Sequence, residues 1–126
     1  MKTFLMVIAV VMLSTLTYAQ TKGDKILGDW LMNDGTRKIN IYKQGVNYFG
    51  KITWVAKPEM KDEVGKIVMR DMSYLDGTYD EGEFIMPNEK HSASCYAELQ
   101  NDGSIKMTIY HGLKLFGHNI FLTKSK

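Results

Sequence analysis

This chain of 126 residues contains little cysteine and carries only a small net charge. Its single cysteine, Cys95, excludes an internal disulfide, so packing must hold the fold together. The formal net charge is only +2 at pH 7, and the excess is scattered along the sequence. A small and scattered excess gives no electrostatic footprint for nucleic acid or for an anionic membrane. We therefore expect a small packed domain with no nucleic-acid partner.

The usual motifs of catalysis and metal binding are also missing. The histidines, His91, His111 and His118, have none of the spacings of zinc ligands, and a lone cysteine cannot form a ligand pair. No Gly-x-Ser-x-Gly elbow or phosphate-binding glycine loop occurs. Cys95 lies on the apolar phase of its segment, which favours a small core residue over a nucleophile. We expect no catalytic residue, no metal and no cofactor.

The longest apolar run lies at the amino end and has the layout of an export signal. Lys2 gives a positive start, residues 4–13 are apolar, and residues 17–19 supply the small residues of a cleavage site. The run is too short to cross a bilayer, which takes about 20 residues, and this disfavours the alternative of a membrane anchor. We expect a cleaved signal peptide over residues 1–19 and one domain over 20–126, periplasmic or secreted, without a membrane span.

Turn signals recur at short intervals through the rest of the chain. Asn-Asp-Gly at 33–35 and Asp-Gly at 76–77 supply the positive φ angles that tight hairpins need. Between the turns, apolar and polar residues alternate with the period of two that is typical of a sheet with one wet face. The charged segment 56–64 predicts a longer loop at a barrel mouth. The predicted strands span about 26–33, 36–43, 46–55, 65–73, 79–86, 91–100, 104–112 and 115–124.

An antiparallel sheet of eight strands must protect its edges, and closure into a barrel does so. The prediction is an all-β fold, a small antiparallel up-and-down barrel of about eight strands. Gly28-Asp29-Trp30, which opens the first strand, resembles the Gly-x-Trp motif of lipocalins and other calycins. In that fold the Trp closes one end and a basic side chain of the last strand packs across it. The resemblance implies barrel-closing roles for Gly28, Trp30 and Lys124.

The chain also resembles the bacterial exported domain-of-unknown-function family 2147. The family's Tyr-x-Gly-x-Ile-x-Trp strand matches residues 48–54 at every specified position, and its Leu-Phe-Gly segment matches residues 115–117. Met86 and His118 stand where the family has an Asp and an Arg, so a function tied to those groups would be altered here. The resemblance implies a small exported lipocalin-like barrel whose activity is undefined.

A barrel of eight strands can be filled by its own side chains or can hold one small ligand. We expect a cup for a small hydrophobic or amphipathic molecule, with Arg70 or His111 orienting its polar group. Trp54 is taken in phase with Tyr48 and Ile52, and Gly50 between them leaves room for a ligand or marks a bulge. The residues expected to wall the cup are Tyr48, Ile52, Trp54, Met69, Phe84, Met107 and Ile109.

Two other functions remain open from the sequence. The first is a structural or protein-interaction module of the cell envelope, with a filled core and a contiguous aromatic patch outside. That patch would consist of Tyr42, Phe49, Tyr96 and Tyr110. The second is an enzyme with a polar site in the barrel mouth, which would require His91, His111 and Glu83 to meet around one cavity.

Overall fold

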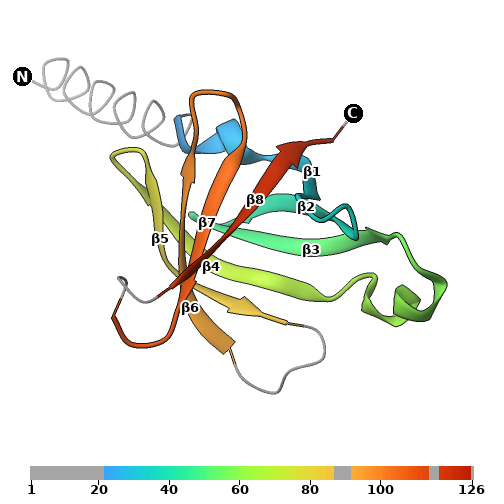
Figure 1. Cartoon of the computed structure of the whole chain (residues 1–126). Helices are drawn as coiled ribbons and strands as arrows, with labels where there is room; N and C mark the ends of the chain where they lie inside the picture. The colour runs from blue at the N-terminus through green and yellow to red at the C-terminus, as the bar shows by residue number, and fades with distance from the viewer. Residues whose placement is uncertain (1–21, 87–91, 114–116, 126) are drawn as a thin grey trace, which may run out of the picture.

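Eight antiparallel strands close into one up-and-down barrel (Figure 1). The computed structural model describes residues 22–86, 92–113 and 117–125, and the predicted signal peptide lies outside them. β8 returns to pair with β1, which completes the barrel. The predicted eight-stranded barrel is confirmed. The strands are β1 (Gly28–Met32), β2 (Arg37–Gln44), β3 (Asn47–Val55), β4 (Ile67–Leu75), β5 (Thr78–Ile85), β6 (Ser92–Leu99), β7 (Ile105–Tyr110) and β8 (His118–Lys124).

Connections between successive strands alternate between the two ends of the barrel. The hairpins after β2, β4 and β6 share one end, and the connections after β1, β3, β5 and β7 share the other. Asp76 and Gly77 illustrate the tight hairpins, since their φ angles of 49° and 88° are those of a two-residue type I′ turn. The segment expected to be a loop after β3 contains a 3₁₀ helix, η2 (Pro58–Glu63), with Pro58 in its first turn.

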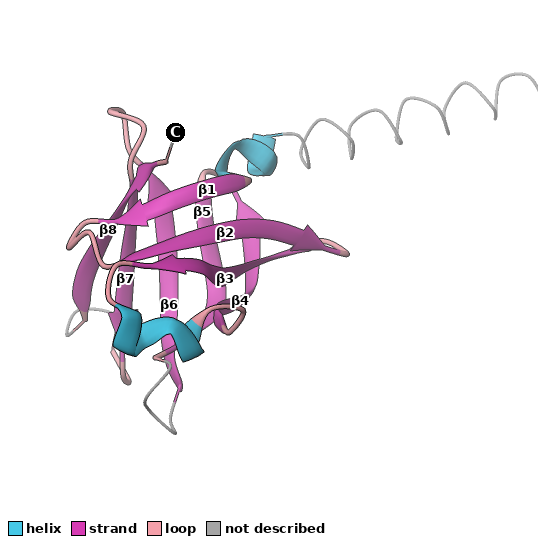
Figure 2. Cartoon of the chain, turned by 90° about the vertical axis from the view of Figure 1, so that its right-hand side faces the viewer, coloured by secondary structure: helices cyan, strands magenta, loops and turns pink. Residues whose placement is uncertain are grey.

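A second 3₁₀ helix, η1 (Asp24–Ile26), lies at the opposite end of the barrel from η2 (Figure 2). No helix in the described part of the chain has the length and hydrophobicity that a bilayer crossing requires.

The positions of η1 and η2 make the two ends of the barrel different. One carries η1 and the hairpins after β2, β4 and β6, and the other carries η2 and the connections after β1, β3, β5 and β7.

Trp30 closes the end that carries η1. Its ring is 2% exposed, and its Nε1 donates a hydrogen bond of 2.8 Å to the carbonyl of Ile26. The Lys124 ammonium lies 4.8 Å from the Trp30 ring centroid and donates to the carbonyl of Leu27 at 3.1 Å. Gly28, at φ 125°, leaves space for this ammonium, because a Cβ there would come within 2.7 Å of it. The structure thus brings Gly28, Trp30 and Lys124 together.

Two buried tyrosines attach η1 to the barrel. Tyr48 donates to the Asp24 carboxylate at 2.6 Å, and Tyr79 donates to the Gly23 carbonyl at 2.6 Å. The two rings meet edge to face with centroids 5.4 Å apart. Burial, followed by the hydrogen bond to Asp24, raises the pKa of Tyr48, so its hydroxyl stays a donor across the physiological range. These contacts fix the closed end.

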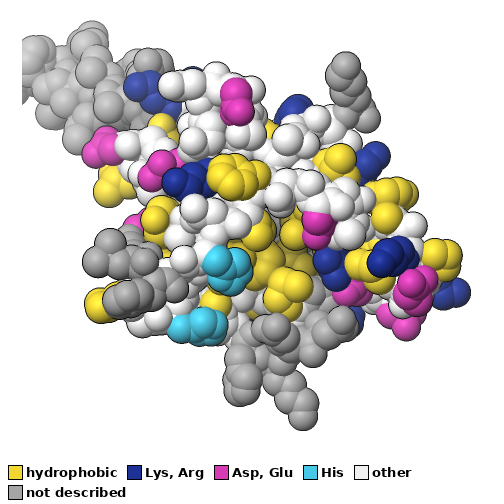
Figure 3. All heavy atoms as spheres, in the orientation of Figure 1, with side chains coloured by type: hydrophobic (Ala, Val, Ile, Leu, Met, Phe, Trp, Pro, Cys, Tyr) yellow, Lys and Arg dark blue, Asp and Glu magenta, His cyan; other side chains and the backbone are white. Residues whose placement is uncertain are grey.

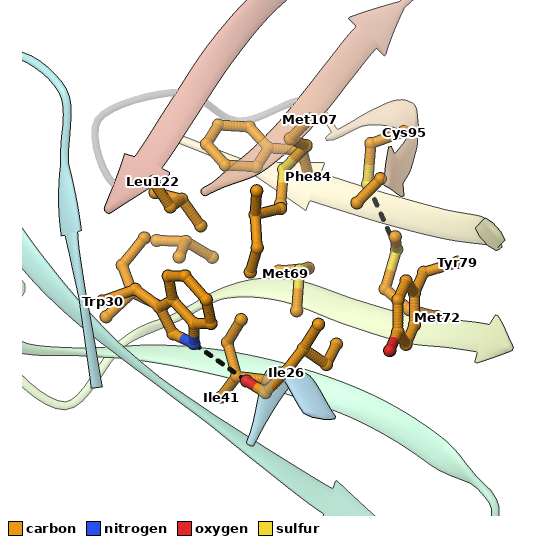
Figure 4. Packing of buried hydrophobic residues seen from close by; sticks show 14 of the residues in the cluster. Ile26, Trp30, Ile41, Met69, Met72, Tyr79, Phe84, Cys95, Met107 and Leu122 are labelled. Carbon is orange, nitrogen blue, oxygen red and sulfur yellow. Dashed lines mark hydrogen bonds between the residues drawn. The ribbon is translucent and has the colours of Figure 1, made fainter. Parts of the chain in front are cut away.

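Side chains from all eight strands form the buried core in the middle of the barrel, and Figure 4 shows part of this packing. Ile52, Met72 and Cys95 are fully buried, and Met69 and Met107 are nearly so. The Cys95 sulfur lies 3.5 Å from the Met72 sulfur. Flexible methionine side chains fill irregular space in cores of this kind. A ligand therefore has no room in the centre of the barrel as it is described.

Cys95 is expected to react very slowly with iodoacetamide while the protein is folded. Burial, reinforced by the negative charges of Asp80 and Glu83, raises the pKa of its thiol to about 12. Since the thiolate is the nucleophile, only a very small fraction of the thiol is reactive at pH 8 even before access is considered. Mass spectrometry after timed labelling should show full modification in urea and almost none in buffer. Equal rates in both conditions would contradict the buried position.

Candidate functional site

The open end of the barrel contains a cavity of about 400 Å³. Figure 3 shows a hollow with a hydrophobic floor and histidine side chains along one side. A smaller void beneath it continues toward Ile39 and Val68 and stops at the packed core. The residues that line the cavity are Met32, Asp34, Arg37, Phe84, Met86, Ala93, Ile109, His111, His118 and Ile120.

Apolar side chains at strand ends form the cavity wall. Phe84 near the end of β5 lies opposite Ala93 near the start of β6, and both face the cavity. Ile109 of β7 and Ile120 of β8 line the other side. Ala93 is small, and the space beside it is part of the hollow. The wall is therefore suited to hold an apolar group, and burial there contributes about 25 cal/mol per Å².

Arg37 is the best-fixed polar group at the cavity. Its Nε and Nη2 donate to the two carboxylate oxygens of Glu63 at 2.8 and 3.0 Å, and the side chains are only 14% and 6% exposed. The hydrogen bonds from Arg37 hold the pKa of Glu63 below its usual range. Arg37 Nη1 has Thr36 Oγ1 at 3.4 Å, a weak partner. The bidentate pair thus fixes the guanidinium while its Nη1 edge retains capacity for another acceptor.

Two histidines and one aspartate complete the rim. His118 begins β8 opposite Ile109, and His111 follows the end of β7; both are exposed. Asp34 lies in the turn after β1, where one of its oxygens accepts from the Thr36 amide and hydroxyl. Within the described residues no cluster of three or more His, Cys, Asp or Glu is arranged to hold a metal ion. The rim can orient a polar or charged group by hydrogen bonds.

The predicted ligand-binding residues other than Trp54 and Arg70 separate into three groups. Phe84, Ile109 and His111 line the cavity. Ile52, Met69 and Met107 point into the same barrel interior but belong to the packed core beneath it. Tyr48 lies at the closed end, where it holds η1. The expected cup is therefore shallower than the sequence predicted.

The prediction that Trp54 lies in phase with Tyr48 and Ile52 is wrong. Trp54 is 42% exposed on the outside of the barrel. Lys38 pairs with Trp54 while its neighbour Ile39 pairs with Ile52, so β3 has one extra residue at this point. A β-bulge of this kind shifts the following residues to the other face. The alternation that holds from Tyr48 to Ile52 consequently fails at Trp54.

The prediction that Arg70 lies at the mouth is also wrong, because the structure places it on the outer surface. It forms an ion pair of 2.7 Å with Glu83, and both side chains are nearly half exposed. Outward-facing β4 and β5 positions bring the two together in register. Glu83 therefore does not meet His111 at the cavity, and His91 lies outside the described residues.

The four aromatic residues of the alternative interaction patch form two separate pairs. Tyr42 stacks on Phe49 across β2 and β3, with centroids 5.7 Å apart. Tyr96 and Tyr110 pair across β6 and β7, with centroids 6.1 Å apart. These strand pairs are not neighbours in the barrel. The expected contiguous patch is thus absent among these four residues, all of which the structure describes.

Several cavity residues escaped the sequence prediction, among them Met32, Arg37 and Ile120. Each lies at the carboxyl end of an odd-numbered strand or near the amino end of an even-numbered one. In an up-and-down barrel these ends meet at the same mouth. The direction of each predicted strand shows which of its ends lies at the open mouth. That signal selects these cavity residues in place of residues in the middle of the strands.

Comparisons with known proteins agree with this geometry. The fold is similar to that of protein HP1028 from Helicobacter pylori, which is described as belonging to the lipocalin family. That likeness has a TM-score of 0.67 at 8% sequence identity and covers 80% of this chain and 83% of the other. No curated protein matches the chain. The model of a family described as "Uncharacterized protein conserved in bacteria (DUF2147)" matches residues 28–124. The chain belongs to this family.

Proposed function

We propose that this protein binds a small amphipathic molecule at the open end of its barrel. The observation that carries the proposal is the 400 Å³ hollow, with apolar walls and a polar rim, at the end that Trp30 does not close. Concave, largely apolar sites with a few convergent polar groups are the usual form of a small-molecule site. The similarity to a lipocalin fold supports the same interpretation.

The dimensions of the cavity limit the ligand. Its volume lies near the lower end of the roughly 300–1,000 Å³ that ligand pockets span. The core beneath is closed by Ile52, Met69 and Met107, so a long chain cannot extend down the barrel axis. We infer a compact ring system or a medium-length alkyl chain, with its apolar part against Phe84 and Ile109.

The rim favours an anionic head group on this ligand. Arg37 is fixed by Glu63 and keeps its Nη1 edge for an acceptor, and His111 and His118 can each donate from a ring nitrogen. The Asp34 carboxylate lies close enough to Arg37 for their charges to interact, so it partly offsets the attraction of Arg37 for an anion, and the head group would lie toward the histidines. The amino-terminal pattern of residues 1–19 leads us to propose that binding takes place outside the cytoplasm.

Titration with 8-anilinonaphthalene-1-sulfonate, a fluorescent aromatic anion, tests the proposal. We expect saturable fluorescence enhancement with one site per chain, displaced by decanoate below its micelle concentration. Ala93→Trp should abolish saturation, because the indole would occupy the hollow beside Phe84. The readout uses direct excitation of the dye, so the added tryptophan does not contribute.

Leu75→Ser is the control for that titration. Leu75 is 75% exposed at the closed end of the barrel, so its replacement should leave the dye affinity within about twofold of the original, well under the 1.4 kcal/mol of a tenfold change. Thermal unfolding of both variants verifies that they are folded. A flat titration of the unmodified protein, or equal affinity in Ala93→Trp, would exclude the cavity as the site.

A further inference from the structure

A group of exposed apolar side chains lies on the outside of the barrel around the connection between β3 and β4. Trp54, Val64 and Ile67 are 42%, 46% and 44% exposed. The backbone brings the segments together, since Ile67 pairs with Lys51 and the Gly65 amide donates to the Ile52 carbonyl at 2.7 Å. Outward positions of a barrel in water are normally polar. These three residues, together with Lys38, Lys51, Lys57, Lys61 and Lys66, are called the basic-apolar face below.

Five lysines lie on the same segments or next to them. Lys38 is in β2, Lys51 is in β3 with its ammonium 5.5 Å from the Tyr42 ring centroid, Lys57 precedes η2, Lys61 lies within η2, and Lys66 precedes β4. Lys38 Nζ lies 5.3 Å from the Trp54 ring centroid. Against the five lysines stand the exposed carboxylates of Glu59 and Asp62. Figure 3 shows basic, acidic and hydrophobic side chains side by side at the right, where Figure 1 places β3 and η2.

The third carboxylate of this segment does not reduce the local positive charge. Glu63 is 5% exposed and is compensated by the bidentate contact with Arg37. Five lysines against two exposed carboxylates therefore give this part of the surface a local positive excess. The small net charge of the chain conceals this local excess, because acidic residues elsewhere balance it.

We propose that the basic-apolar face docks on an anionic lipid surface. Tryptophan is well suited to the membrane–water interface, because its ring is apolar and its N–H can bond to water or head groups. Lysine stems lie along apolar surface while their ammonium groups reach anionic phosphates. Near an anionic surface each lysine contributes roughly a fivefold gain in binding. Charge complementarity favours this occupant over an uncharged protein surface.

Docking in this way would bring the mouth of the barrel to the membrane. η2 lies at the open end, and its last residue, Glu63, is bonded to Arg37 of the cavity. An amphipathic molecule that leaves the lipid surface would then have a short path into the cavity. The docking proposal itself does not require a ligand, so it can be tested separately from the proposed function.

Vesicle binding by the protein purified from an exporting host provides the test. The probes are vesicles of phosphatidylglycerol and phosphatidylcholine in equal parts, and vesicles of phosphatidylcholine alone. We expect co-sedimentation with the anionic vesicles at low salt and its loss at high salt. Trp30 is buried, so a blue shift of fluorescence and quenching by brominated lipid tails would report on Trp54. Trp54→Ser/Ile67→Thr should weaken binding by about tenfold or more.

Matched variants at other exposed positions control for general hydrophobicity and charge. Val46→Thr/Leu75→Ser removes more exposed apolar side chains at the opposite end and should leave vesicle binding unchanged. Lys57→Gln/Lys61→Gln should weaken binding about fivefold per lysine, whereas Lys25→Gln/Lys106→Gln should have less effect. Absence of binding to anionic vesicles overturns the proposal. So does an equal loss of vesicle binding in a test variant and its control, for either the apolar or the lysine substitutions. The proposal is also overturned if analytical ultracentrifugation shows a dimer that Trp54→Ser/Ile67→Thr no longer forms, because the face would then be buried in that dimer.

Discussion

Replacing Trp30 with alanine is expected to lower the free energy of unfolding by about 3–5 kcal/mol, the range of large-to-small changes at buried aromatic positions. The indole is 2% exposed and fills the closed end of the barrel. Its loss also leaves the Ile26 carbonyl without its donor, and it removes the ring on which the Lys124 ammonium lies. Urea denaturation followed by circular dichroism measures the change.

The other tryptophan provides a control with the same side chain. Trp54→Ala removes an indole that is 42% exposed and contacts Lys38 from the outside, and should cost at most about 1 kcal/mol. Trp30→Phe should fall between the two, because the phenyl ring restores part of the volume without the N–H. Equal effects of the two alanine variants would contradict the assignment of Trp30 to the closed end.

The contrast between the two tryptophans also shows how far the sequence determines the fold. Alternation with a period of two placed Ile105, Met107 and Ile109 on the inner face, and all three are buried. The Asp-Gly pair at 76–77 specified a hairpin through the φ angles that it permits. Local patterns of this kind, repeated along the chain, predicted the eight strands and hence the closed barrel.

Trp54 fell outside that prediction because a bulge is a property of two strands. The extra residue in β3 is defined only by its pairing with Lys38 and Ile39 of β2. Nothing within residues 48–54 interrupts the alternation, so the sequence alone continues the inner phase to Trp54. Predictions of side-chain orientation from alternation therefore fail at irregularities in strand pairing. There, a residue assigned to the cup lies on the outer surface.

The candidate site was harder to predict than the fold for a different reason. Phase distinguishes inward from outward residues, but it does not give the height of a residue along the barrel axis. Met69 and Met107 were assigned correctly to the interior, yet they lie in the packed layer below the cavity. Arg37 and Glu63 are 26 residues apart, and only the folded chain joins them. The rim thus depends on tertiary contacts that have no local sequence signal.

That ion pair gives the second large effect: Glu63→Gln is expected to cost roughly 3 kcal/mol, because it leaves the largely buried guanidinium of Arg37 without the carboxylate that compensates it. The pair also ties η2 to the start of β2. Glu83→Gln is the matched control, since the Arg70–Glu83 pair is exposed and should have no measurable effect on stability. Arg37→Met/Glu63→Met should recover most of the loss, because it removes both charges together.

The dependence on pH distinguishes this charge effect from a simple packing defect. Arg37 holds the pKa of Glu63 below its usual range, so the folded state binds a proton less readily than the unfolded chain. The stabilisation is therefore complete above the ordinary glutamate pKa of roughly 4.3, and it is lost as the pH falls below that value.

The carboxylates of Asp24 and Asp34 also have lowered pKa values, but they are present in both the unmodified protein and Glu63→Gln. The difference in stability between the unmodified protein and Glu63→Gln should consequently be constant at neutral pH and shrink in acid. A difference that stays the same from neutral to acid pH would mean that the variant acts through shape and not through charge.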